Sequence, residues 1–269
     1  MGNNYASIVV DAGPSPDVRW RLETARGFAA RYGGKLIAVA HAWPRTSLVQ
    51  EALRPSSILS AQMTTMSLEA SLATTRTIYD EIVARGEVEG EWCGAVGEPL
   101  PPLCEHALSA DLVIVGNERH EIFLSADPTE VARRTGTPVL KLASGAPTAF
   151  RRVLIGWKDS RQARDAVHDA LPVLAQAEAV VLAGIGDEVT LDRLKDVAAH
   201  LARHGVSARP IHLANAAGVS SQILNLAREE GADLLVTGAY SRTRNRERVF
   251  GGVTRDLSES TELSWLFAH

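Results

Sequence analysis

Short apolar runs alternate along the chain with segments whose apolar positions recur every three or four residues. "SIVVD" and "KLIAVA" are such runs in the first half, and "RVLIG" and "DLLVTG" are such runs in the second. Nearly continuous apolar runs are typical of parallel strands that are covered on both faces, and the periodic segments between them predict helices. The alternation therefore predicts an α/β protein with doubly wound parallel sheets.

The helical spacing is clearest near the N-terminus, where apolar positions recur at Val18, Leu22, Ala25, Ala29 and Tyr32. Ser and Thr residues precede three of the expected helices and are the predicted N-caps, because their side-chain oxygens accept hydrogen bonds from the first turn. These residues are Ser15, Ser160 and Thr190.

The same order of elements occurs twice. "SIVVDAGPS" resembles "RVLIGWKDS", and Val153 follows Ile8 by 145 positions; "ADLVIVG" resembles "ADLLVTG", and Gly238 follows Gly116 by 122 positions. The difference of 23 positions indicates an insertion in the first half. The chain therefore reads as a tandem duplication with one expanded connection.

The repeat places the domains at residues 1–148 and 149–269, with a helical insertion near residues 44–86. The inserted segment carries an apolar stripe at helical spacing, formed by Leu59, Met63, Met66, Ala70 and Ala73. Methionines in such a stripe are usually core residues, but they also suit adaptable partner surfaces. The stripe could also cover a small apolar ligand.

These segments resemble the universal stress protein family in its tandem two-domain form. The second half is similar over nearly its whole length, and the first half is similar more weakly, through "SIVVDAG", "KLIAVAHAW", "ADLVIVG" and "TGTPVLKLA". The resemblance implies two five-stranded, Rossmann-like parallel sheets, each with strand order 3-2-1-4-5. It also implies that the two halves pair face to face, as subunits do in the family's homodimers, and that the protein acts in the stress response.

Family members that bind ATP carry a glycine, two residues, a second glycine, nine residues, and a glycine followed by Ser or Thr. The first glycine lets the backbone approach the nucleotide, and the later pair starts a helix whose free N–H groups favour phosphate. By resemblance, the second half would bind ATP or ADP through Gly238, Ser241, Gly251, Gly252, Val253 and Thr254.

The match to this motif is incomplete. Ser241 stands where the second glycine is expected, and Gly252 replaces the hydroxyl residue, for which Thr254 is a substitute. Trp157 stands where nucleotide-binding relatives carry an aspartate at the end of the first strand, and its indole could fill the adenine pocket. The first half keeps Asp11 at that strand end but has neither later glycine after Gly116.

The composition narrows the classes of function. The net charge of −4 argues against a general nucleic-acid binder, and no apolar run reaches the roughly 18 residues of a membrane span. Cys93 and Cys104, the two cysteines, are not in a CxxC motif and suit a reducing, cytoplasmic location. A locally basic stretch suits either phosphate binding or a solvent-exposed loop. It contains arginines 242, 244, 246, 248 and 255.

No catalytic constellation is present in the sequence. His200 and His204 have the spacing of two metal ligands on a helix but no third ligand nearby, so no metal site is expected. We therefore expect a cytoplasmic universal stress protein that acts by binding, with weak ATP or ADP affinity in its second half and a protein partner. Slow ATP hydrolysis and homodimerisation remain open. The alternative is an interaction module without nucleotide, working through the inserted helix.

Overall fold

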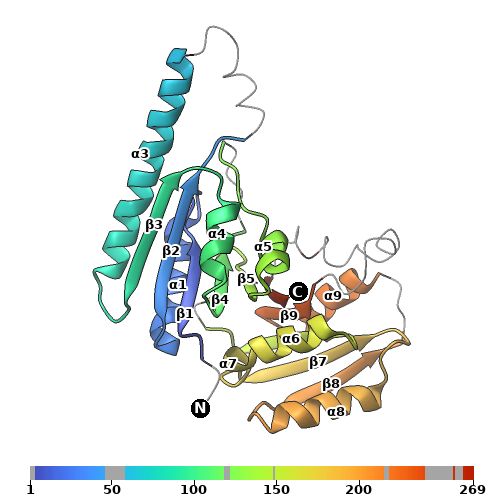
Figure 1. The fold of residues 1–269 in the computed structure, drawn as a ribbon. Coiled ribbons are helices and arrows are strands. Elements are labelled where there is room, and N and C mark those ends of the chain that lie inside the picture. Colours follow the sequence, from blue (N-terminus) through green and yellow to red (C-terminus); the bar gives the residue numbers. More distant parts are fainter. Residues whose placement is uncertain are drawn as a thin grey trace. The chain divides into compact units, whose positions relative to one another are not determined.

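The structure is a computed structural model that describes residues 4–45, 58–117, 122–147, 149–214, 218–239, 257 and 263–269, with backbone only for residues 58–65. Contacts divide the chain into two compact units, residues 5–137 and residues 138–269 with 1–4. Figure 1 shows the same alternation of strands and helices in both.

The first unit contains a parallel sheet with the strand order β3-β2-β1-β4. Its strands are β1 (Ser7–Asp11), β2 (Lys35–Ala42), β3 (Gly90–Val96) and β4 (Leu112–Val115). Its helices are α1 (Val18–Tyr32), α3 (Ile58–Val83), α4 (Leu100–Ala107) and α5 (Pro128–Thr135).

The second unit repeats this arrangement with the strand order β8-β7-β6-β9-β10, all parallel. Its strands are β6 (Arg152–Trp157), β7 (Ala179–Ile185), β8 (Ala208–Leu213), β9 (Leu234–Gly238) and β10 (Ser264–Ala268). Its helices are α6 (Arg161–Asp169), α7 (Leu171–Leu174), α8 (Leu191–Ala202) and α9 (Val219–Glu230).

The fifth strand of the first repeat, β5 (Val139–Lys141), groups with the second unit because it pairs antiparallel with β10. The doubly wound α/β fold and the order 3-2-1-4-5 are therefore confirmed. The predicted repeat boundary after residue 148 stays a prediction.

Burial explains why the apolar runs became strands. Ile8, Val9 and Val10 are each completely buried, as expected for a strand covered on both faces. Helix α1 buries its predicted face and ends at Gly33, whose φ of 64° allows its N–H to reach the carbonyl of Ala29.

The predicted caps are confirmed in the second unit only. Ser160 accepts a hydrogen bond from the N–H of Ala163 at 3.2 Å, and Thr190 accepts one from Arg193 at 3.2 Å. In the first unit α1 begins later than Ser15 predicts, with Asp17 as its N-cap residue.

The insertion forms the long helix α3, as predicted, but the predicted stripe is wrong. Met66 is 68% exposed, and Ala70 and Ala73 are also exposed, while Leu59 and Met63 lie outside the described side chains. The packed face instead carries Leu68, Leu72, Thr75, Tyr79 and Ile82. This face carries more apolar surface than the face with Met66, Ala70 and Ala73. Its burial therefore contributes more hydrophobic free energy to folding.

Candidate functional site

Gly238 ends β9 at the carboxyl edge of the second sheet, where ligands bind in open α/β sheets. A Cβ at this position would lie 2.5 Å from the backbone nitrogen of Ala163 and 2.6 Å from the carbonyl carbon of Gln162. Only a glycine therefore allows the strand to end against the first turn of α6. This packing requirement is a reason for the glycine that is independent of any ligand.

The other predicted nucleotide-binding residues lie outside the described part of the chain. They are Ser241, Gly251, Gly252, Val253 and Thr254, and all five arginines of the basic stretch lie outside it too. Their role in binding stays a prediction.

Gly116 follows β4 at the equivalent place in the first repeat. A Cβ here would overlap Asp17 Oδ2 and Arg21 Nη1, so two charged side chains of α1 occupy the space beside the strand end. Both residues are buried, with 8% and 3% of their surface exposed. The first repeat thus closes its own crevice with an ion pair.

A hydrogen-bond network holds this ion pair in place. Arg21 Nη1 lies 3.6 Å from Asp17 Oδ1, and Arg21 Nη2 donates to the carbonyl of Gly13 and to Ser15 Oγ, each at 2.9 Å. The hydroxyl of Ser15 donates in turn to Asp17 Oδ1. The loop between β1 and α1 is therefore tied to the helix that follows it.

The second repeat lacks this pair. Ile8 on β1 lies opposite Leu112, and Val153 on β6 lies opposite Leu234, so Ile8 and Val153 are equivalent. The same offset of 145 positions makes Gln162 the counterpart of Asp17 and Ala166 the counterpart of Arg21. At these two positions the second repeat therefore has no charged side chain, and the strand end lies against the backbone and Cβ of Gln162 and the backbone of Ala163.

The same register corrects the predicted equivalence of Asp11 and Trp157. Asp11 is the counterpart of Gly156, and Trp157 is the counterpart of Ala12. A Cβ on Gly156 would contact Thr237 and Ile223 of α9, and because strand side chains alternate, Trp157 faces the opposite side of the sheet.

The indole of Trp157 is held on that side by hydrogen bonds. Its Nε1 donates to Asp159 Oδ1 at 2.8 Å, and Asp159 also accepts from Arg193 Nε at 3.0 and 3.1 Å. Trp157 lines a groove between α6 and α8.

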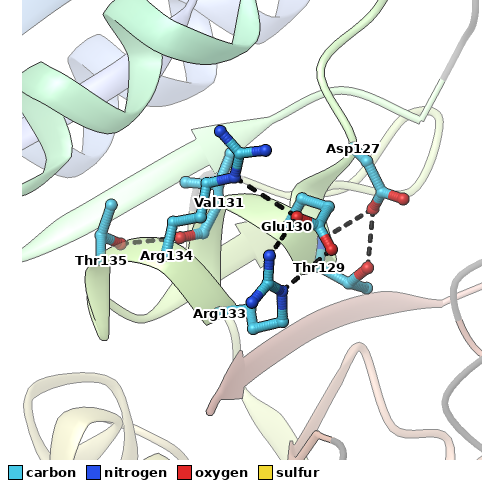
Figure 2. Close-up of polar contacts among 7 residues, drawn as sticks. All are labelled: Asp127, Thr129, Glu130, Val131, Arg133, Arg134 and Thr135. Carbon is cyan, nitrogen blue, oxygen red and sulfur yellow. Dashed lines mark hydrogen bonds and ion pairs between the residues drawn. The ribbon is translucent and has the colours of Figure 1, made fainter.

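Helix α5 of the first repeat carries its own anions at its N-terminus (Figure 2). Asp127 Oδ1 accepts from the backbone N–H of Thr129 at 2.9 Å and from its hydroxyl at 2.7 Å. Glu130 in the first turn binds Arg133 at 3.0 and 2.8 Å and Arg134 at 3.3 Å. The hydrogen bonds from Arg133 lower the pKa of Glu130, which therefore stays ionised.

This helix follows the fourth strand of its repeat, which is the place where the family motif puts a phosphate-binding helix. Asp127 already accepts from the N–H of Thr129 and places a negative charge at this end of the helix, where a phosphate would otherwise bind. The described residues of the first repeat therefore offer a poor phosphate site.

The remaining candidates do not form a further site. The rings of His200 and His204 lie edge to face, 4.9 Å apart, and within the described ranges no three His, Cys, Asp or Glu residues are grouped to hold a metal. Burial raises the pKa of both Cys93 and Cys104, which disfavours the reactive thiolate. Among the described helices, none is long and apolar enough to cross a membrane.

Sequence reasoning missed the Asp17–Arg21 pair and the groove between α6 and α8. The spacing of four residues was a signal for an ion pair on α1, but such pairs usually lie on exposed helix faces. Whether the pair is buried depends on where β4 ends, which a local pattern does not encode.

No protein-family model matches the sequence, and no curated protein matches it significantly. Solved structures do match. A universal stress protein from Archaeoglobus fulgidus has a TM-score of 0.73 and 14% identity, with 97% of each chain covered. A universal stress protein from Pseudomonas aeruginosa, described as putative, has a TM-score of 0.63 and 15% identity, covering 97% of this chain and 92% of its own.

A functionally unknown protein from Pseudomonas aeruginosa matches with a TM-score of 0.61 and 14% identity, again covering 97% of this chain and 92% of its own. At 97% coverage these matches extend over both repeats. The chain therefore has the fold of the tandem universal stress proteins, as its sequence predicted.

Proposed function

We propose that this chain is a universal stress protein that acts by binding rather than catalysis, and that it binds ATP or ADP in its second repeat only. The nucleotide would contact Gly238, Ser241, Gly251, Gly252, Val253 and Thr254. A nucleotide that binds one state of this loop more tightly than another shifts the loop toward that state. The shift would control which protein partner docks.

The observation that supports this proposal is the difference between the two repeats at the same strand end. In the first repeat, the buried side chains of Asp17 and Arg21 occupy the space beside Gly116. In the second, the equivalent residues are Gln162 and Ala166. A phosphate ligand entering the second repeat meets neither the ion pair nor a buried carboxylate at these positions.

The charge at the helix that follows the fourth strand supports the same assignment. In the first repeat Asp127 and Glu130 place two carboxylates at the N-terminus of α5. In the second repeat, the sequence between Gly238 and Gly251 contains four arginines and a single acidic residue, Glu247. The second pattern offers a phosphate an excess of positive charge, whereas in the first the carboxylates are offset by Arg133 and Arg134.

A second candidate function is an interaction module that uses α3. The exposed face of α3 carries Met66, Ala70 and Ala73. The hydroxyls of Thr74 and Thr77 donate to the carbonyls of Ala70 and Ala73 at 3.0 Å, so these hydroxyls have hydrogen-bond partners within the helix. A face of this kind suits a partner protein, because methionine adapts to irregular surfaces.

Calorimetric titration with ATP separates the two candidates. We expect heat with the wild type, none with Gly251→Val, and unchanged heat with Gly97→Val. Gly97 is a matched control, because it directly follows β3 in the first repeat and a Cβ there would make an ordinary contact with His41 at 3.7 Å. Absence of heat with the wild type, or equal heat with Gly251→Val, contradicts the nucleotide proposal.

A further inference from the structure

A groove of about 260 Å³ lies between α6 and α8 of the second repeat. Four buried or nearly buried aliphatic side chains line it: Val167, Leu171, Val197 and Leu201. The indole of Trp157 lines it as well. The groove is thus large enough for a small molecule and offers one aromatic and several aliphatic contact surfaces.

The equivalent helices of the first repeat are α1 and α3. Helices α1 and α3 pack directly against each other, Arg19 of α1 binds Glu81 of α3 at 2.8 Å, and Arg85, just after α3, binds Glu23 of α1 at 3.3 Å. Helices α6 and α8 contact each other at few points. The groove therefore lies between two helices that are packed less closely than their counterparts in the first repeat.

The aromatic wall of the groove is held in position by polar contacts. Asp159 accepts a hydrogen bond from the Trp157 indole at 2.8 Å and binds Arg193 of α8 at 3.0 and 3.1 Å. The indole therefore spans from β6 toward α8 in one orientation. A wall fixed before binding lowers the entropic cost of holding a flat ligand against it.

Two arginines line the groove, Arg164 from α6 and Arg193 from α8, together with one carboxylate, Asp196, and the imidazoles of His168 and His200. Because Arg193 is paired with Asp159, Arg164 is the arginine best placed to meet a ligand. Arg164 uses Nη1 to bind Asp165 at 3.0 Å, and its side chain is 72% exposed. A guanidinium has five N–H donors, so Arg164 can also bind an incoming anion.

We propose that this groove binds a small organic anion, with one aromatic ring or an apolar group of similar size and a single carboxylate. The ring would lie against Trp157 and the aliphatic floor, and the carboxylate would face Arg164 and His168. The volume is below the range of about 300–1,000 Å³ that is usual for drug-sized ligands, so a one-ring ligand fits better than a nucleotide. The proposal does not depend on nucleotide binding to the loop after Gly238.

Titration with 4-fluorobenzoate, followed by fluorine NMR, tests the proposal on the full chain. We expect saturable binding of 4-fluorobenzoate that is weakened about tenfold in Arg164→Glu, the size expected when a charge-assisted contact is lost. Arg161→Glu is the matched control, because Arg161 also lies on α6 and binds Asp165 but does not line the groove. Its affinity should equal that of the wild type.

Two further measurements place the ligand and its charge. The side-chain N–H signal of Trp157, identified by its absence in Trp157→Phe, should shift on titration. The neutral analogue 4-fluorobenzamide should bind at least about tenfold more weakly than 4-fluorobenzoate. Absence of binding, equal loss in Arg161→Glu and Arg164→Glu, an unmoved Trp157 signal, or equal binding of the amide would each overturn the proposal.

Discussion

Replacement of Arg21 by alanine is expected to destabilise the first unit strongly. The change removes a guanidinium whose side chain is only 4% exposed and leaves the carboxylate of Asp17, 6% exposed, without its cation. It also removes the hydrogen bonds to Gly13 and Ser15. Breaking a buried ion pair from one side costs about 3–5 kcal/mol, because the remaining charge stays out of water.

The double variant Asp17→Gln with Arg21→Ala carries the residues that the second repeat has at these positions. It leaves no unpaired buried charge, so we expect it to be less destabilised than Arg21→Ala alone. The remaining cost comes from the volume that the arginine side chain filled. The two single variants and the double variant complete a double-mutant cycle that isolates the coupling between the two side chains.

Urea unfolding, followed by circular dichroism and fluorescence, measures these changes in free energy. The matched control is Arg19→Ala on the same helix, because Arg19 binds Glu81 at 2.8 Å with its side chain 47% exposed. An exposed ion pair contributes only about 0–1 kcal/mol. If Arg21→Ala costs no more than Arg19→Ala, the ion pair does not fill and stabilise the crevice as described.

Three further changes have defined outcomes. Asp127→Ala should lower stability by about 1 kcal/mol in thermal unfolding, because it removes the cap on Thr129, and Asp127→Ser should restore most of the loss; equal losses would contradict the capping role. Burial raises the pKa of Asp169 to about 6. The ionised carboxylate therefore lowers the free energy of unfolding above pH 6, and this loss of stability disappears toward pH 4. Asp169→Asn should therefore stabilise the chain at pH 8 by about 1–2 kcal/mol, allowing for partial exposure, and by much less at pH 4; the same gain at both would argue against this titration. Leu68→Ala should lower the free energy of unfolding by about 2–5 kcal/mol, because Leu68 is only 4% exposed. Met66→Ala should lower it by less than about 0.5 kcal/mol, because Met66 is 68% exposed, and the reverse order would mean that α3 packs through its other face.

The strands and the repeat could be predicted because their signals are local. A parallel strand buried on both faces must be apolar at nearly every position, as Ile8, Val9 and Val10 are, and this requirement holds wherever the strand lies in the sheet. Two matched series of such runs, ending at Gly116 and Gly238, then indicate a duplication. The order of the strands came from the family resemblance.

The packed face of α3 and the contents of the two crevices could not be predicted in this way. Helix α3 has two faces at helical spacing, and the choice of Leu68 over Met66 depends on which neighbours the sheet supplies. The pairing of Asp17 with Arg21 depends on the end of β4, which is distant in sequence. The groove between α6 and α8 depends on helix separation, which a single sequence does not encode.

The two repeats differ most directly in the number of nucleotides that one chain is expected to bind. Native mass spectrometry of the full chain in the presence of ATP counts them directly. Closure of the first crevice by Asp17 and Arg21 and binding at the loop after Gly238 together predict one nucleotide per chain, and none in Gly251→Val. Two nucleotides per chain, or none at ATP concentrations that saturate calorimetry, would contradict the account.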